Sequence, residues 1–225
     1  MEPRHFETEL QALKNRLLGM GALVEERVHQ AMQALMERRV DAAEAIVAGD
    51  GEVNDLQIEI DDRCLKLLAL QNPMASDLRL ITAAMKINAD LERIGDQAVN
   101  IAENAVKVAA APPLRPIIDL PRMAELAEAM TRDSLDAFVR RDSELARDIL
   151  ARDDEVDQLK DQIFRVLLTH MMADPGTIER ALGLILVSRN LERIADHATN
   201  IAEDVIFIAE AKDVRHHAEQ GAEKP

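Results

Sequence analysis

The sequence predicts an all-α fold of six helices, arranged as two tandem three-helix antiparallel bundles, and three observations predict it. Thirteen residues starting at Leu91 return one hundred residues later, starting at Leu191, with ten positions identical, which indicates an internal duplication. Apolar residues recur at helical spacing along most of the chain. The 225 residues include only 8 Gly, 8 Pro and 4 Phe, with no Trp or Tyr, so the aromatic residues that favour strands are nearly absent.

The first bundle is expected over residues 1–111. Gly49-Asp50-Gly51 marks a connection or cap before the second helix, and Asn72-Pro73 ends that helix because the residue before a proline disfavours helical geometry. The third helix carries the first copy of the duplicated run. The three helices are predicted over 6–36, over 53–70 and from residue 75 onward.

The second bundle is expected over residues 117–211, followed by a polar, frayed tail at 212–225. The Pro-rich segment from Ala111 to Pro116 falls near the middle of the chain and indicates the linker between the repeats. Its three helices are predicted over 120–139, 145–172 and 177–211.

The duplicated run carries a stripe of polar residues along one side of its helix. At about 100° per residue, four polar positions fall within roughly 80° of arc and along about 16 Å of axis, while the apolar residues lie on the opposite side. The stripe consists of Glu92, Asp96, Asn100 and Glu103, and the second copy repeats it as Glu192, Asp196, Asn200 and Glu203. Helical periodicity alone would preserve only the apolar positions, so the repeated polar residues indicate a site.

Two interpretations of the stripe are open, a solvated helix face and a metal site. Like charges four residues apart repel each other, and no Lys or Arg lies within the arc to compensate, which favours the metal site. Carboxylate and amide oxygens are ligands of hard cations. We predict one set of metal ligands in each half, namely Glu92, Asp96 and Asn100, and Glu192, Asp196 and Asn200.

The predicted cofactors are divalent or trivalent metal ions with oxygen ligands. Oxygen ligands favour Mg, Mn, Ca or Fe over a structural Zn site, although bound Zn stays possible. His197 lies about 100° around the helix from Asp196 and is expected behind a ligand or on the plain surface. A hairpin folded at residue 73 brings residue 54 level with Glu92, and one folded at 174 brings Asp157 level with residue 191. Acidic residues of each second helix are therefore expected beside the stripe.

A metal-dependent oxidase of the di-iron type is the main alternative function, and a metal-buffering helical bundle is the other. A ferritin-type centre needs two Glu-x-x-His pairs turned into the core, whereas the chain has that spacing once, from Glu26 to His29. The sequence also lacks a phosphate-binding glycine loop and a nucleophile motif. We therefore predict no catalytic residue and no enzymatic activity.

The net charge of −15 opposes binding to nucleic acid or to an anionic lipid surface. No apolar stretch approaches the roughly 20 residues of a membrane span, and Met1 to Leu10 lacks the apolar region of a signal peptide. The sequence thus predicts a cytoplasmic protein without direct membrane insertion, which would reach a membrane only through partners. The single cysteine, Cys64, is expected to be buried and inert.

The chain resembles the PhoU family of phosphate transport accessory and regulatory proteins. The resemblance rests on Asp77-Leu78-Arg79, on Glu92-Arg93-Ile94-Gly95-Asp96 with Asn100, and on the second copy, and it extends to about Ala211. It implies two three-helix bundles that carry metal on the doubled motif. It also implies negative regulation of phosphate-starvation genes by an adaptor between a phosphate ABC transporter and a sensor histidine kinase.

A homodimer is expected as well. The second copy departs from the first at Ala195, and it has Ile178-Glu179-Arg180 where the first has Asp77-Leu78-Arg79. The two halves are therefore not expected to be equivalent in partner binding.

Overall fold

The computed structural model describes residues 3–71, 73–114 and 119–214, and every regular element within these ranges is a helix. The prediction of an all-α fold is therefore confirmed. The α-helices are α1 Pro3–Glu37, α2 Val40–Ala48, α3 Gly51–Gln71, α4 Ala75–Ala109, α5 Leu120–Arg140, α6 Ser143–Ala173 and α7 Ile178–Glu210. A single 3₁₀ turn, η1 Pro175–Thr177, precedes α7.

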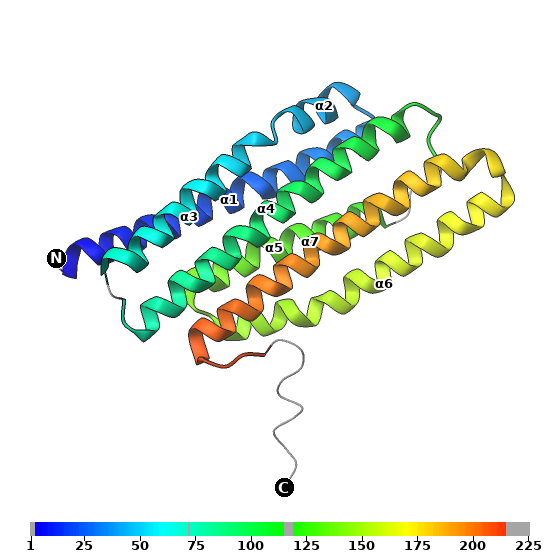
Figure 1. Ribbon diagram of the computed structural model, residues 1–225. Coiled ribbons are helices and arrows are strands. Elements are labelled where there is room, and N and C mark those ends of the chain that lie inside the picture. The colour runs from blue at the N-terminus through cyan, green and yellow to red at the C-terminus, as the bar shows by residue number, and fades with distance from the viewer. Residues whose placement is uncertain (1–2, 72, 115–118, 215–225) are drawn as a thin grey trace, which may run out of the picture.

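Each half of the chain folds into an antiparallel three-helix unit, and the two units lie side by side (Figure 1). Helices α1, α2–α3 and α4 form the first unit, and α5, α6 and α7 form the second. The most extensive packing between any two helices is that of α4 against α7. The α3–α4 and α6–α7 hairpin tips point to opposite ends of the molecule (Figure 1). The two copies of the duplicated run therefore flank one central interface.

The second helix of the first unit is broken into two pieces, and the sequence prediction included only the second piece. Residues 40–48 form a separate helix, α2, where no element was expected, whereas α6 runs unbroken through the equivalent stretch of the second unit. The backbone N–H of Gly49 closes α2 by donating to the carbonyls of Ala45 and Ile46. Arg27 then bridges the break, because its Nη2 donates to the Gly49 carbonyl at 2.5 Å and lies 3.3 Å from Glu52. The Gly49-Asp50-Gly51 signal thus marks a break inside one long arm.

The ends of the other helices follow from local chemistry. Helix α6 begins two residues before its predicted start, because the carboxylate of Asp142 caps it by accepting from the backbone N–H groups of Glu144 and Leu145 at 3.1 and 3.0 Å. The chain leaves α5 through Arg141 and α1 through Arg38, both at positive φ, which shows that the duplication extends to the turns. Residues 111–114 and 212–214 are not helical; the rest of the predicted linker and tail lies outside the described residues.

Small residues set the spacing of the central helices. Leu91, Ile94, Ala98 and Ile101 of α4 and their counterparts in α7 have no exposed surface, so one side of each motif helix is fully inside the core. A Cβ atom added at Gly183 of α7 would lie 2.6 Å from Val108 Cγ2 of α4. Because Val is stiff at χ1, this contact leaves no room for a side chain.

The remaining sequence predictions about the chain as a whole concern Cys64 and membrane spans. Cys64 is buried as predicted, and burial raises the pKa of its thiol to about 12. Among the described residues, no helix combines the length and the apolar character that crossing a bilayer requires.

Replacing Gly183 by Ala tests the close approach of α4 and α7. Alanine favours a helix by about 1 kcal/mol over glycine, yet overpacking a core costs about 1 to 3 kcal/mol, so we expect Gly183→Ala to lower the free energy of unfolding by up to about 2 kcal/mol. Urea unfolding measures this change. The matched control is Gly19→Ala in α1, where an added Cβ meets nothing within 4 Å. The control should stabilise the protein, and stabilisation by both variants would contradict the packing argument.

Candidate functional site

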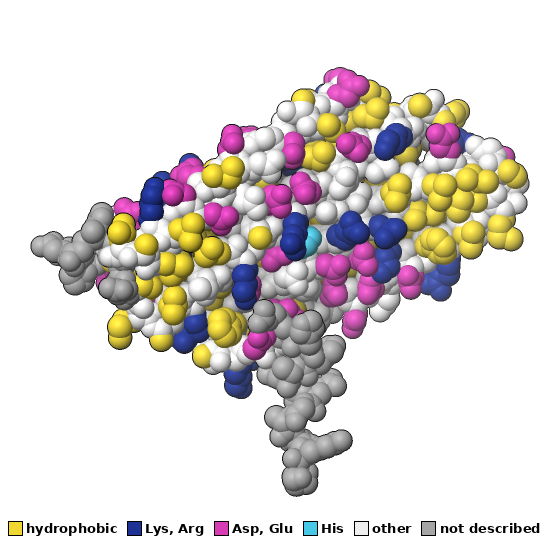
Figure 2. All heavy atoms as spheres, viewed as in Figure 1, with side chains coloured by type: hydrophobic (Ala, Val, Ile, Leu, Met, Phe, Trp, Pro, Cys, Tyr) yellow, Lys and Arg dark blue, Asp and Glu magenta, His cyan; other side chains and the backbone are white. Residues whose placement is uncertain are grey.

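Both copies of the polar stripe lie at the middle of their helices on the outer side. Asp96 and Asp196 are exposed, and Glu92 and Glu192 are half-buried, while the apolar side of each run faces the core. Acidic side chains gather around the middle of the face formed by α3, α4, α7 and α6 (Figure 2). A ferritin-type centre would lie inside a bundle core, so these exposed carboxylates do not form one.

The first cluster joins the stripe of α4 to the break between α2 and α3. Burial is the largest cause that raises the pKa of Glu92, and the charge of Asp96 adds to it. The pKa of Asp96 is raised for the same reason, with Asp50 as the neighbouring charge. Asp50 also accepts a hydrogen bond from Asn54 Nδ2 at 3.2 Å. The acidic neighbour of this stripe is therefore Asp50, which precedes the predicted second helix, and the predicted register of residue 54 with Glu92 stays a prediction.

The second cluster repeats the first with one added cation. Burial and the charge of Asp196 raise the pKa of Asp153 to about 6, and burial and Glu192 raise that of Asp196. Lys160 of α6 places its Nζ 2.6 Å from Asp157 Oδ1 and 3.0 Å from Glu192 Oε1. The hydrogen bond with Asp157 is the main cause that raises the pKa of this ammonium. The register predicted for Asp157 is thus confirmed.

Lys160 makes the two clusters chemically different. The repeats of this helix are offset by 103 residues, so the equivalent position in the first half is Gln57, which carries no charge. The sequence argument found no basic residue within the arc of either stripe, but it missed Lys160 because the lysine comes from the neighbouring helix. Aligning the two halves of the sequence shows this difference, because Lys160 aligns with Gln57. The same alignment places Asp50 opposite Asp153.

The asparagines of the stripe have different surroundings. Asn200 Nδ2 donates to Asp90 Oδ1 at 3.3 Å, and His197 Nδ1 lies 2.9 Å from the same oxygen. In the first copy the backbone carbonyl of Asn100 accepts from Asn104 Nδ2 at 2.7 Å. His197 therefore ties α7 to α4 and lies behind Asn200 through their shared partner Asp90.

The carboxylates do not already converge on one point. Within the part of the chain that the structure describes, no three His, Cys, Asp or Glu side chains are arranged as a ready metal site. The donor set nevertheless fits a cation, since burial and mutual repulsion raise the pKa values of Glu92, Asp96, Asp153 and Asp196, and a bound positive charge relieves both effects.

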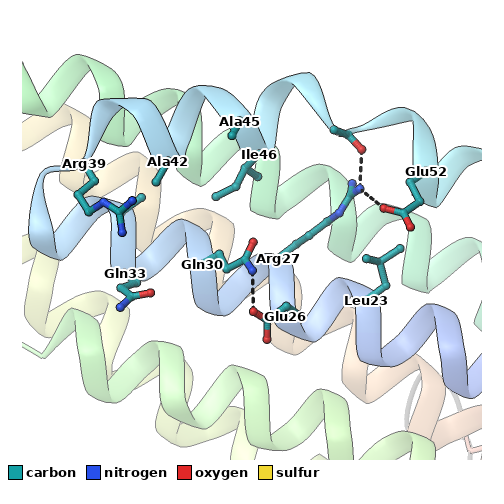
Figure 3. Close-up of a pocket in the computed structure, with 12 residues that line it drawn as sticks. Leu23, Glu26, Arg27, Gln30, Gln33, Arg39, Ala42, Ala45, Ile46 and Glu52 are labelled. Carbon is teal, nitrogen blue, oxygen red and sulfur yellow. Dashed lines mark hydrogen bonds and ion pairs between the residues drawn. The ribbon is translucent and has the colours of Figure 1, made fainter.

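A cavity of about 460 Å³ lies beside the helix break, between α1 and α2 (Figure 3). Arg27 lies toward Gly49 and Glu52 at one end, Arg39 lies at the other end, and Gln30 lies between them (Figure 3). In the second half the equivalent space holds Arg152, which forms ion pairs with Asp133 and Asp148. No sequence signal identified this cavity.

The comparisons with known proteins agree across sequence and structure. The PhoU domain matches residues 17–105 and again 120–205. The phosphate-specific transport system accessory protein PhoU homolog of Aquifex aeolicus is 41% identical over 208 residues, covering 92% of this chain and 94% of that protein. The homolog of Pseudomonas aeruginosa is 39% identical over 214 residues, covering 95% and 88%.

Two solved structures share the fold. The crystal structure of PhoU from Pseudomonas aeruginosa superposes with a TM-score of 0.88 at 38% identity, covering 92% of this chain and all of that one. The phosphate transport system regulatory protein PhoU from Streptococcus pneumoniae gives a TM-score of 0.87 at 31% identity, covering 93% and 99%.

The raised pKa of Asp153 makes a prediction about stability and pH. A carboxyl whose pKa is higher in the folded state costs stability when it ionises, so the cost appears as the pH rises from about 3.8 to about 6. In the presence of a chelator, Asp153→Asn should be about 1 to 2 kcal/mol more stable than the parent at pH 7, after allowance for solvent screening, and nearly equal to it at pH 3.5. Urea unfolding at several pH values measures the difference.

The control for this prediction is Asp161→Asn, which changes an exposed aspartate of the same helix outside the cluster. Its stability relative to the parent, measured at the same pH values, is the baseline for the Asp153→Asn comparison. If Asp153→Asn changes the free energy of unfolding equally at pH 3.5 and pH 7, ionisation of this carboxyl does not destabilise the folded protein, and the prediction is wrong.

Proposed function

The chain belongs to the PhoU family, and from that premise we propose that it is an accessory regulator of phosphate uptake that holds phosphate-starvation signalling in check. The relatives are named as accessory or regulatory proteins of a phosphate-specific transport system. None of these names describes an enzyme, which agrees with the prediction that the chain has no catalytic activity. The observation that carries the proposal is the doubled PhoU domain, which spans most of the chain.

The finer part of the proposal concerns partners. The protein acts as an adaptor between a phosphate ABC transporter and a sensor histidine kinase, and it reaches them from the cytoplasm as a homodimer. The family resemblance and the high content of exposed charge support this role. With a net charge of −15, the chain is suited to basic protein surfaces, and ionic attraction to them weakens as salt shortens the screening length to about 8 Å and below.

We also propose that the two acidic clusters bind metal. The ligands are Glu92, Asp96 and Asn100 in the first half, and Glu192, Asp196 and Asn200 in the second. We add Asp50 and Asp153 as neighbouring carboxylates. The charge of Asp50 raises the pKa of Asp96, and the charge of Asp196 raises the pKa of Asp153. A bound cation would neutralise each cluster and hold the two helices of its hairpin together, and this chain's residues supply only oxygen ligands.

Exchanging one residue between the halves tests the metal proposal. Gln57→Lys should weaken the first site about tenfold or more, because an ammonium about 4 Å from a cation costs several kcal/mol at the effective dielectric of a protein surface. The converse change, Lys160→Gln, should strengthen the second. Metal content is measured in protein purified without a tag and then dialysed against Mn²⁺, Mg²⁺ or Fe²⁺.

The double variant Asp96→Ala with Asp196→Ala sets the baseline for that experiment and should carry no bound metal. Equal metal content in the parent, the two single variants and this double variant would contradict the proposal. Oxygen consumption by the metal-loaded protein would instead support the oxidase alternative.

Deletion of the encoding gene tests the regulatory proposal. Phosphate-scavenging genes should then be expressed in phosphate-rich medium, and a plasmid copy of the intact gene should repress them again. Transporter and kinase subunits should be recovered with the tagged protein from gently solubilised membranes, less so as salt rises. Normal repression in the deletion strain together with no recovery of either subunit would rule out this role.

A further inference from the structure

The tip of the α6–α7 hairpin exposes a ladder of large apolar side chains. Three residues of α6 lie level with three of α7, because each pair is equally distant from the turn at Pro175. The rungs are Phe164 with Leu186, Leu168 with Leu182, and Met172 with Ile178. All six side chains are between 41 and 79% exposed. The rungs are about 6 Å apart, so the ladder is about 12 Å long. Figure 2 shows this end of the molecule as a continuous apolar surface.

Among the described residues, the complete ladder is found in the second half of the chain. The other hairpin tip shares two of the positions, with Leu65 for Leu168 and Leu78 for Ile178. Three others are polar there and bond within the protein. Asp61 accepts from Asn88, the hydroxyl of Thr82 donates to the Leu78 carbonyl, and Lys86 pairs with Asp204; these three stand where Phe164, Leu182 and Leu186 stand at the ladder. The α3–α4 tip also exposes Leu70 and Met74, so it carries apolar residues, but the polar residues at these three positions interrupt the ladder there.

Uncompensated positive charge borders the ladder. Arg165 and Arg189 form no ion pair with a carboxylate in the described ranges, whereas the first repeat has Asp62 and Ala89 at these positions. Arg180 donates hydrogen bonds to the backbone carbonyls of Pro112 and Gly176. The hairpin from residue 163 to 189 holds three arginines and two acidic residues, a net charge of +1, within a chain of −15. The rim thus attracts carboxylates, which the rest of the surface repels.

We propose that the α6–α7 tip is the docking surface for an amphipathic helix of a partner protein that carries apolar residues and carboxylates. Such a helix lays its apolar stripe along the ladder and its carboxylates against Arg165 and Arg189. Exposed Phe, Met and Arg side chains are typical of protein interfaces. This inference rests on the proposed function, because it specifies the chemistry of the partner segment in the transport or sensing machinery.

A lipid bilayer fits the same surface less well. Along α7, the exposed Asp196 lies about 21 Å from Leu182, and Asp153, Asp157 and Glu192 lie around it. A flat anionic bilayer on this face would meet that acidic cluster, whereas a single helix covers only the tip.

A labelled peptide of eighteen residues tests the proposal directly. It has leucine along one face and glutamate beside it, and its counterpart replaces each glutamate with lysine. Fluorescence anisotropy should show that the full chain binds the glutamate peptide at least tenfold more tightly than the lysine peptide. Leu182→Gln with Leu186→Gln should weaken binding at least tenfold. The matched control, Leu65→Gln with Leu78→Gln at the other tip, should leave it unchanged.

The charge reversal Arg189→Glu should weaken binding of the glutamate peptide and strengthen binding of the lysine peptide. All of these positions are exposed, so helix content and melting temperature should match the parent in every variant. Absence of binding, or equal loss in the ladder and control variants, would overturn the proposal. So would binding of the parent to phosphatidylglycerol vesicles through the ladder, or a dimer that becomes monomeric only in the ladder variant. Metal content and phosphate-gene repression are separate readouts, so failure here leaves the proposed function standing.

Discussion

The packing of α4 against α7 is the constraint on which the rest of the structure depends. Both helices bury one whole side in a shared core, and Gly183 allows them to approach so closely that no Cβ fits between α7 and Val108. A helix fixed in this way cannot rotate about its axis. The polar stripe on its other side is therefore held at a defined place on the surface, beside the second helix of its own bundle, and this placement creates both acidic clusters.

The two halves share one helical arrangement, but they carry different side chains at equivalent positions. The second cluster contains its own cation in Lys160, whereas the first has the neutral Gln57. A different arginine contacts the second helix in each half. Arg27 reaches from α1 to the break, whereas Arg152 belongs to α6 itself and pairs with Asp133 and Asp148. Within the described residues, the helix break and the cavity beside it lie in the first half, and the apolar ladder lies in the second.

These differences divide the molecule by task. Carboxylates with raised pKa values occupy the middle of one face, where a cation would relieve their repulsion. Both hairpin tips expose some large apolar side chains, but the ladder lies at the α6–α7 tip, where Arg165 and Arg189 form no ion pair with a carboxylate of the described residues. A surface that separates the proposed cation sites from the apolar ladder suits the proposed role of connecting other proteins. The homologues named as transport accessory proteins are consistent with this division.

The sequence by itself determined the helical class, the two bundles, the turn at Pro73 and the outward stripes, because these depend on local periodicity and on an internal repeat that can be compared within one chain. It also placed Asp157 beside the second stripe, since hairpin geometry fixes which residues are level. Only the tertiary structure decided that residues 40–48 form a helix of their own, that Lys160 pairs with Glu192 of the second stripe, and that His197 bonds to Asp90. The last two are contacts between side chains of different helices, which depend on helix rotation and spacing rather than on any pattern within one helix.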